Sequence, residues 1–410
     1  MRERSNYDDS DTALVNRLDV QPHVSKKVKL GEICEVTTGK WDANHSVSNG
    51  KYRFYTCAYD YAFCNTKRFG GECLILPGNG ANVGEVFYYN GDFDAYQRTY
   101  VIYNIKINPK YLFYHLKLHW KKSTDSKQYG SATNYIRIGN FNEYQLSCPP
   151  TATQHLIVTK LEELFSELDK GVEQLKLAQQ QLKVYRQAVL KWAFEGRLTN
   201  NNVKESELPE GWKLESLKNI GKWTGGGTPS KQNPDFWTKG TVSWVSPKDM
   251  KARIILETID KITEGSITQS SAKWIKKGSI LFVVRSGIIR RMLPIAIAGK
   301  DLTTNQDLQS LTLNNDLNSE FVYWYCVSNE QSIREACAKD GTTVDNLDVP
   351  KLKNYPIVIC PFREQEKVIQ EIESRLSVAD KMEESINDAL AQAEVLRQSI
   401  LKRAFEGRLI

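Results

Sequence analysis

The chain has 410 residues, a formal net charge of +6 at pH 7, and 40% hydrophobic and 25% charged residues. This length exceeds that of one ordinary domain, and no apolar run approaches the length of a bilayer span. The start, MRERSNYDDSD, lacks the apolar segment of a signal peptide, and the eight cysteines form no CxxC pair. These features disfavour a membrane protein, a secreted protein and a zinc ribbon, and they predict a cytoplasmic protein of two or more domains.

The positive charge is concentrated in two long segments. Residues 1–150 hold 19 Lys and Arg against 15 Asp and Glu, and residues 208–363 hold 21 against 16. This distribution is compatible with a polyanionic partner such as nucleic acid.

The first of these segments follows a polar lead-in over residues 1–27. We expect it to form an α+β domain over residues 28–152, because short strand-like pieces alternate with Gly- and Asn-rich turns. Order is expected to begin at Val28–Val36, and the predicted strands are Tyr52–Ala58, Cys73–Leu76, Val83–Tyr89 and Tyr100–Ile107. An amphipathic helix is predicted at Tyr111–Trp120, and Ser131–Arg137 and Phe141–Cys148 close the domain.

Two later stretches repeat each other. Gln154–Leu198 aligns without a gap to Gln365–Leu409, 211 residues further on, and both end in AFEGRL. Apolar residues recur in heptads, which is typical of helices that pack on one another. The first seam contains Leu161, Leu168, Leu175, Leu182 and Val189, with Ile157, Leu164, Ala178, Tyr185 and Trp192 on the companion positions. The second contains Ile372, Ala379, Ile386, Ala393 and Ile400, with Val368, Met382, Ala389 and Leu396 beside them.

The ends and one interior position of the first helix carry local signals. Thr151 and Gln154 fit a capping box, and Gly196 fits a C-terminal stop. Gly171 lies on the seam, where it predicts a local weakening or a close approach. We therefore predict spacer helices over residues 153–198 and 364–410, with a linker over residues 199–207.

The segment at residues 208–363 matches the sequence of the first domain at a few widely spaced positions, which we call anchors. Leu217–Ile220 matches Leu30–Ile33, the strand entry at 277–281 matches 70–74, and Phe321–Val327 matches the Tyr111 helix. Two further anchors keep the 211-residue offset: Gly341–Thr343 matches Gly130–Ala132, and Asn354–Pro356 matches Glu143–Gln145. The sequence thus predicts an order of domain, helix, domain, helix.

Chain length limits how the helices can pair. A helix of about 45 residues spans roughly 65 Å, whereas a linker of about ten residues reaches at most roughly 35 Å. The second domain must therefore begin near the far end of the first helix, which predicts two long antiparallel helices related by a pseudo-twofold axis.

Candidate nucleic-acid contacts are basic, amide, hydroxyl and aromatic residues in loops. Arg, Asn and Gln can bind base edges, while Lys, Ser and Thr mostly bind phosphates. In the first domain they are Lys40, Trp41, Arg53, Tyr55, Arg68, Asn79, Asn82, Arg98, Asn134 and Arg137. In the second they are Thr228, Ser230, Lys231, Trp244, Lys248, Lys251, Arg285, Ser286, Arg290, Arg291, Asn305, Gln306, Thr342 and Thr343.

Two alternatives to nucleic-acid reading start from other residues. Asp235, Asp249 and Lys251 fit the loose carboxylate–carboxylate–lysine pattern of nucleases, although the first domain has no counterpart. His115 and His119 have the i, i+4 spacing of metal ligands, but no third ligand accompanies them, so no metal site is predicted.

The repeated AFEGRL ends predict two equivalent docking surfaces for two copies of one partner. Their residues are Trp192, Phe194, Glu195 and Arg197 in the first copy, and Phe405, Glu406 and Arg408 in the second.

Together, these motifs resemble the DNA-specificity subunit of type I restriction–modification enzymes. The resemblance rests on the two AFEGRL helices, on LPEGW at 208–212, GGGTPS at 225–230 and VSWVSPKDM at 242–250, and on TNQD at 304–307 and GTT at 341–343. In the first domain TTGKW at 37–41 replaces the GGTP opening.

The resemblance implies a chain without catalytic residues. Each target-recognition domain would read half of a bipartite DNA site, and the helices would set the gap and dock two methyltransferase subunits. S-adenosylmethionine, Mg and ATP would be bound by these modification subunits and by restriction subunits, and no cofactor by this chain. A self-contained nuclease and a purely structural coiled-coil adaptor are the competing hypotheses. Half-sites about one duplex turn apart are expected.

Overall fold

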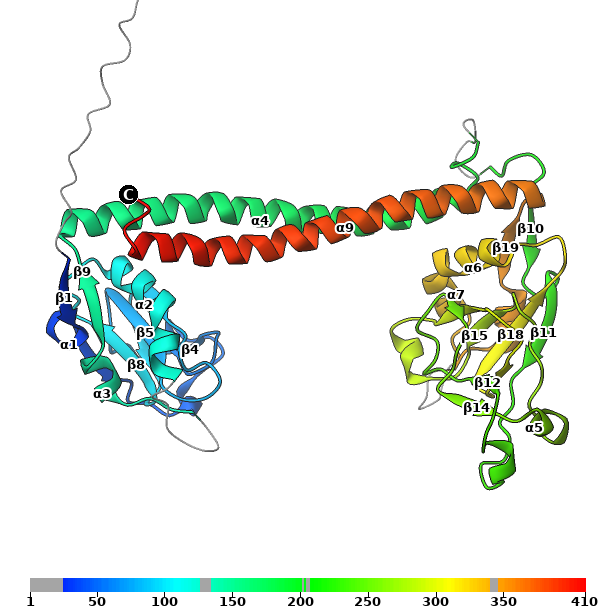
Figure 1. Ribbon diagram of the computed structural model, residues 1–410, viewed down its shortest axis with the longest axis horizontal. Helices are drawn as coiled ribbons and strands as arrows, with labels where there is room; N and C mark the ends of the chain where they lie inside the picture. Colours follow the sequence, from blue (N-terminus) through cyan, green and yellow to red (C-terminus); the bar gives the residue numbers. More distant parts are fainter. Residues whose placement is uncertain (1–24, 126–133, 201–202, 204–206, 340–345) are drawn as a thin grey trace, which may run out of the picture. The chain divides into compact units, whose positions relative to one another are not determined.

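The computed structural model describes residues 25–125, 134–200, 203, 207–339 and 346–410. The chain forms two compact units. One comprises the residues up to Leu175 together with Asp388–Ile410, and the other is Lys176–Asn387. Each unit therefore contains a small α+β domain and one half of each long helix, α4 (Thr151–Phe194) and α9 (Phe362–Phe405) (Figure 1).

The first unit contains a four-stranded antiparallel sheet in the order β2-β8-β5-β6, a three-stranded sheet β4-β3-β7 and a pair β1-β9. Its strands are β1 (Lys26–Lys29), β2 (Glu35–Thr38), β3 (Tyr52–Tyr55), β4 (Ala62–Cys64), β5 (Glu72–Pro77), β6 (Phe87–Asn90), β7 (Phe93–Ala95), β8 (Thr99–Tyr103) and β9 (Gln145–Cys148). Its helices are α1 (Leu30–Ile33), η1 (Ala43–His45), α2 (Pro109–Asp125) and α3 (Ile138–Asn142).

The second unit repeats this topology. Its sheets are β11-β18-β15-β16-β13, β14-β12-β17 and β10-β19, so β13 is the one strand among the described residues without a counterpart in the first unit. The strands are β10 (Lys213–Ser216), β11 (Gly221–Gly225), β12 (Val242–Val245), β13 (Ile254–Ile255), β14 (Asp260–Ile262), β15 (Ile280–Val283), β16 (Ile295–Ala298), β17 (Thr303–Thr304), β18 (Leu308–Leu313) and β19 (Pro356–Ile359). The helices are η2 (Pro234–Phe236), α5 (Glu264–Gln269), η3 (Gly287–Arg290), α6 (Ser319–Ser328), α7 (Glu330–Ala336) and α8 (Val349–Asn354).

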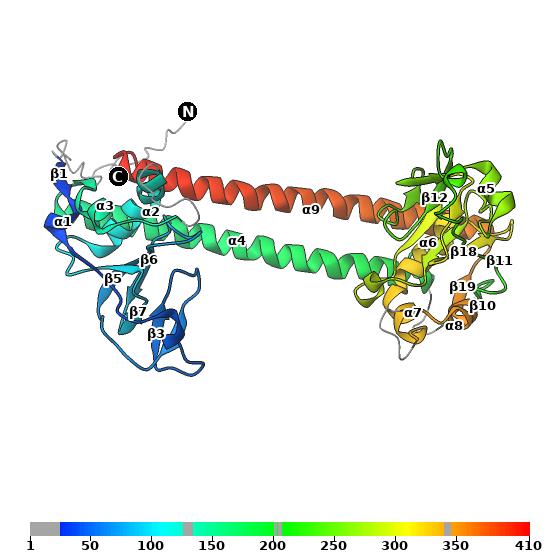
Figure 2. The same cartoon turned by 90° about the horizontal axis from the view of Figure 1, so that it is seen from below.

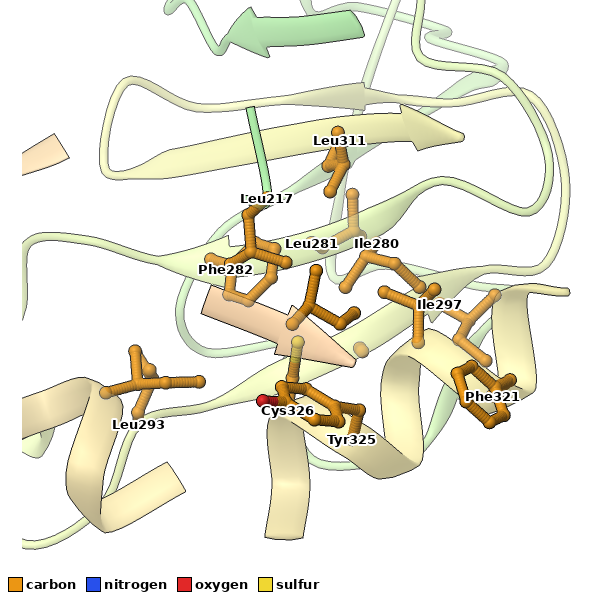
Figure 3. Close-up of a cluster of buried hydrophobic side chains, with 14 of the residues drawn as sticks. Leu217, Ile280, Leu281, Phe282, Leu293, Ile297, Leu311, Phe321, Tyr325 and Cys326 are labelled. Carbon is orange, nitrogen blue, oxygen red and sulfur yellow. The ribbon is translucent and has the colours of Figure 1, made fainter. Parts of the chain in front are cut away.

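Each unit has its own hydrophobic core, to which the long helices contribute. In the second unit Phe282 and its neighbours on β15 belong to the same buried cluster as Phe321 and Cys326 of α6, and Phe282 lies beside Leu217 (Figure 3). Val189 and Ala193 of α4 are fully buried in the same core. In the first unit Leu161 is equally buried beside the domain. The long helices are therefore part of the folded domains.

Within each unit the two long helices run antiparallel, as the linker length predicts (Figures 1 and 2). In the first unit Asp169 of α4 forms an ion pair with Arg397 near the end of α9. In the second, Arg186 near the end of α4 pairs with Asp380 at 2.6 Å and Glu383 at 2.9 Å, both in the first half of α9.

The heptad prediction is confirmed for the central seam and is wrong for three companion positions. Leu182 and Ala379 are buried, but Trp192 is 37% exposed, Met382 53% and Leu396 49%. An α-helix has 3.6 residues per turn, so a 3.5-residue pattern drifts by about 20° per heptad, and such positions can rotate out of the contact.

Both long helices end in the same way. Gly196 and Gly407 adopt φ of 75° and 71°, and the following Arg197 and Arg408 donate their backbone N–H to Trp192 and Arg403. This is the Schellman arrangement, in which glycine tolerates the left-handed conformation. The predicted stop at Gly196 is thus confirmed.

The capping-box prediction at Thr151 is wrong about the glutamine. The Gln154 side chain is buried, donates to the carbonyl of Pro149 at 2.8 Å, and accepts from the backbone N–H of Asn108 at 2.9 Å. Its amide therefore ties α4 to the domain, because satisfying buried backbone groups is worth more than fixing an exposed helix end.

Leu30–Ile33, within the ordered start at Val28–Val36, forms a helical turn that buries Leu30 and Ile33, since residues at i, i+3 share one face of a helix. Two other local predictions change. The strand predicted from Val83 begins only at Phe87, after a turn in which Gly84 has φ of 103°. Of the weakening or close approach predicted at Gly171, the close approach is not found, because a side chain at this position would meet no neighbour within 4 Å beyond the adjoining backbone of α4.

Candidate nucleic-acid interface

The candidate contacts of the first unit begin in the loop after β2. Lys40 is exposed and makes no ion pair with any described residue. Trp41 is 41% exposed, stacks on His45 at 4.0 Å, and donates from Nε1 to the carboxylate of buried Asp94 at 3.0 Å. The indole is therefore held in a fixed orientation at the surface.

Arg53 lies in an aromatic cluster on β3 and its neighbours. Its guanidinium is 4.2 Å from the ring centre of Tyr61 and 4.4 Å from that of Tyr89, and Nη1 donates to the hydroxyl of Tyr55 at 3.3 Å. That hydrogen bond raises the pKa of Arg53. Because Tyr55 is itself 8% exposed, this pair is already engaged within the domain.

A cavity of about 370 Å³ lies where three loops of the first unit meet. Its walls include Thr38, Asn79, Arg98, Tyr100 and Tyr135. In the residues that the structure describes, the Arg98 side chain has no hydrogen bond or ion pair, and it is exposed. An unneutralised guanidinium at the mouth of a cavity is suited to an anionic or acceptor-rich ligand.

Other predicted contacts of this unit support loops. Arg68 donates to the carbonyl of Thr38 at 2.9 Å, and Asn82 to that of Cys57 at 2.9 Å. The backbone carbonyl of Asn134 accepts from Gly80, and Arg137 donates to the hydroxyl of Tyr135 at 3.1 Å.

The second unit carries a comparable polar rim. Thr228, in the loop after β11, donates to the side chain of Gln306. The backbone carbonyl of Ser230 accepts from Trp237 Nε1 at 3.1 Å. Three lysines in nearby loops are exposed and have no ion pair within the described part of the chain: Lys231, Lys248 and Lys251. Such side chains are suited to phosphate binding.

Arg285 is the most strongly oriented cation of this rim. Its Nε and Nη2 both lie 2.6 Å from Oδ1 of Asp307, whose other oxygen accepts from Asn305 Nδ2 at 2.9 Å. Ser286 caps η3 by accepting from the N–H of Ile288. Arg290 is the last residue of η3, Arg291 follows it, and both are exposed.

Two candidates in the second unit are buried, which corrects the expectation that they face a ligand. Trp244 is 4% exposed and donates to the carbonyl of Gly227 at 3.0 Å. Asn305 is 5% exposed and binds Asp307. Both support the loops. Thr342 and Thr343, with the Gly341 and Gly130 anchors, lie outside the described residues.

Two acidic side chains that were not predicted from the sequence orient candidate contacts. Asp94 holds Trp41, and Asp307 holds Arg285. Asp307 had a signal, since it ends the TNQD motif. Asp94 had none, because its partner lies 53 positions away.

The nuclease alternative loses its central residue. Asp249 accepts from the backbone and hydroxyl of Ser246, each at 2.8 Å, through Oδ2, and from the N–H of Ile259 at 2.8 Å through Oδ1. Both carboxylate oxygens of Asp249 thus hold a turn together, which explains this side chain by its structural role.

His115 and His119 lie against the end of α9 in the first unit. Burial lowers the pKa of His115 to about 3, and its Nδ1 lies 3.1 Å from the hydroxyl of Tyr144. No cluster of three potential metal-ligating residues occurs in the described ranges. His115 is therefore a neutral core residue near pH 7.

The predicted docking residues divide into buried anchors and exposed groups. Phe194 is 6% exposed and packs on Phe321 and Tyr325, so the expectation that it is a surface aromatic is wrong. Phe405, partly buried, packs on Tyr111 and His115 in the same manner. A ring at this position stabilises the junction between helix end and domain.

The charged docking residues repeat an identical ion-pair pattern. Glu195 pairs with Lys191 at 3.7 Å and Arg197 at 3.3 Å. In the second copy the corresponding pairs are Glu406 with Lys402 at 3.9 Å and with Arg408 at 3.3 Å. Arg403 stands where the first copy has Trp192, so the two surfaces are alike in charge pattern and differ in one side chain.

The described helices include none with the length and apolar character needed to cross a membrane. What the structure defines is a tandem-repeat α+β protein with long helical spacers and polar, basic loop rims. The chain belongs to the family of type I restriction modification DNA specificity domains, whose model matches residues 22–177 and 209–392.

Known relatives agree with this assignment. The chain is 29% identical over 402 residues to the type I restriction enzyme EcoDI specificity subunit of Escherichia coli, covering 94% of this chain and 88% of the relative. It is 31% identical over 268 residues to the EcoR124I/EcoR124II specificity subunit of the same species, covering 64% and 62%.

Solved structures show the same fold. A chain from a study of complex assembly and conformational transition of the type I R-M system has a TM-score of 0.70 at 16% identity, covering 95% of this chain and 99% of that one. The HsdS subunit from Thermoanaerobacter tengcongensis has a TM-score of 0.59 at 17% identity, covering 94% and 98%.

Proposed function

We propose that this chain is the DNA sequence-specificity subunit of a type I restriction–modification complex and reads a bipartite, gapped site. Each α+β unit reads one half of the site, and α4 and α9 set the gap. One observation carries this proposal: the two units share one topology but differ in the side chains of their loop rims. Two copies of one scaffold with different rims are suited to reading two different half-sites.

The loop rims supply the two kinds of contact that specific binding requires. Exposed lysines such as Lys40 and Lys248 bind phosphates and position the protein, while Arg, Asn and Gln side chains read base edges. Lysine contacts make binding strongly dependent on salt concentration, whereas base contacts determine the sequence.

The partners are two modification subunits, which dock at the charged helix ends around Glu195 and Glu406, and restriction subunits that join the complex. The repeated ion pairs support two equivalent docking points. S-adenosylmethionine belongs to the modification subunits, and ATP and Mg to the partner subunits. This chain contributes recognition and carries out no catalysis.

The test is co-expression with a cognate modification subunit, followed by methylome sequencing. We expect methylation confined to one gapped motif, whereas a methylome unchanged from that of cells without this chain would refute the proposal. The nuclease alternative is tested by incubating the purified chain with Mg and DNA. That alternative predicts cleavage of the DNA, and it predicts that Asp249→Ala abolishes the cleavage.

The spacer role has its own test. Deleting one matched heptad from both α4 and α9 removes about 10 Å of helix, which corresponds to about 3 bp of duplex. The gap in the methylated motif should shorten while both half-sites stay the same. An unaltered gap would show that the helices do not set the spacing.

A further inference from the structure

One loop cluster of the first unit is built from backbone hydrogen bonds just beyond the end of β5. The N–H of Gly78 donates to the carbonyl of Arg98 at 2.9 Å, and the carbonyl of Gly78 accepts from Ile136 at 3.0 Å. The next residue, Asn79, forms a β-bridge with Tyr135. Three separate loops are thereby held together.

The second unit repeats this cluster bond for bond, just beyond the end of β15. The N–H of Val284 donates to the carbonyl of Asp307 at 2.8 Å, and the carbonyl of Val284 accepts from Leu347 at 2.9 Å. The next residue, Arg285, forms a β-bridge with Asn346. Asn79 therefore corresponds to Arg285, and Arg98 corresponds to Asp307.

The same two positions thus carry different chemistry in the two units. In the first, Arg98 and Asn79 line the cavity of about 370 Å³, and the Arg98 guanidinium is unpaired within the described ranges. In the second, the arginine stands at the other position: Arg285 is 51% exposed and is bound by Asp307, which is oriented in turn by buried Asn305.

We infer that these equivalent clusters are the base-reading sites of the two units, and that Arg98 and Arg285 each bind the major-groove edge of a guanine. The inference rests on the proposed function and names the residues that act in it. A guanidinium carries only donors, and guanine offers two acceptors, O6 and N7, at matching separation.

The surrounding groups explain how each arginine selects its base. Asp307 and Asn305 are positioning residues: they hold the Arg285 fork, so less side-chain freedom is lost on binding. Asn79 lines the cavity beside Arg98, where its amide can accept from and donate to a neighbouring base. Each unit therefore places one arginine at the same loop junction, held by Asp307 in the second unit and lining the cavity in the first.

The test compares methylomes of the complex formed with the modification subunit. The variants are Arg98→Gln, Arg285→Gln and Asp307→Ala, and Arg363→Gln provides a control at an exposed arginine outside both clusters. Arg98→Gln should relax one G·C pair in one half-site, with discrimination falling on the order of ten- to a hundred-fold, and leave the other half unchanged. Arg285→Gln and Asp307→Ala should relax one and the same G·C pair in the other half-site, and the control should keep the motif.

Three outcomes overturn the inference while leaving the proposed function standing. The first is an unaltered motif in both arginine variants. The second is a uniform fall in methylation at all sites with the motif intact, which is what loss of a phosphate contact would give. The third is a wild-type half-site that contains no G·C pair. Absence of any gapped motif with the wild-type chain refutes the proposed function itself. Both arginine side chains are exposed, so the variants are expected to fold.

Discussion

Replacing the buried glutamine at the start of α9 should loosen the second unit as a whole. Gln365 is fully buried and donates to the carbonyls of Cys360 at 2.8 Å and Asp316 at 3.2 Å, and it accepts from the N–H of Asn318 at 2.8 Å. Gln365→Met keeps the size and the helix propensity but removes all three bonds. Leaving the N–H of half-buried Asn318 and the carbonyl of buried Cys360 unpaired costs about 1–3 kcal/mol each, hence about 2–6 kcal/mol in total.

The measurement is denaturant-induced unfolding of the purified chain, followed by circular dichroism. Gln180→Met, at an exposed position on α4, is the matched control and should change the free energy of unfolding by less than about 0.5 kcal/mol. Gln154→Met makes the equivalent change in the first unit and should destabilise that unit by a similar amount. If Gln365→Met is no more destabilising than Gln180→Met, the glutamine does not hold helix and domain together.

Three further predictions address other junctions. Neutral His115 has a pKa of about 3 in the fold against an ordinary 6.5, so the unfolded chain binds more protons as the pH falls. The free energy of unfolding should therefore fall by about 2 kcal/mol between pH 7 and pH 5. His115→Gln should flatten this dependence when unfolding is measured as a function of pH. Phe194→Ala should cost about 3–5 kcal/mol and Phe405→Ala less, as judged by thermal unfolding, while Phe362→Ala at an exposed helix start should have little effect. Asp249→Asn should lower the thermal midpoint of unfolding, and with Mg and DNA neither the wild-type chain nor the variant should cleave. Cleavage by the wild-type chain that the variant loses would instead support the nuclease alternative.

The overall organisation could be predicted from the sequence because it depends on periodic and repeated signals. The heptads and the 211-residue repeat predict the helices, and the linker length predicts their antiparallel course. The anchor before β5 and β15 is confirmed as well, since Gly71 and Gly278 share a positive φ of 72° and 83°. Such signals are local, or they recur at a fixed spacing.

What the sequence did not reveal depends on contacts between distant residues. Phe194 and Trp192 are both aromatics near a helix end, yet one is buried and the other exposed, because only one faces α6. Asn305 looks like a base reader, and its amide is instead occupied by Asp307 two positions later. A residue type indicates what a side chain can bind, but the tertiary fold decides whether it is free to do so.

The loop clusters beyond β5 and β15 are joined by backbone groups, and this has a consequence for how the protein can change. The carbonyl of Gly78 accepts from Ile136 just as that of Val284 accepts from Leu347, although the side chains differ. Main-chain hydrogen bonds of this kind depend little on which side chains the residues carry. Substitutions at exposed positions also usually change the free energy of unfolding by less than about 0.5 kcal/mol. Inherited variation in the exposed side chains can therefore accumulate with little loss of folding, so that new sequence preferences remain accessible to a lineage without redesign of the scaffold.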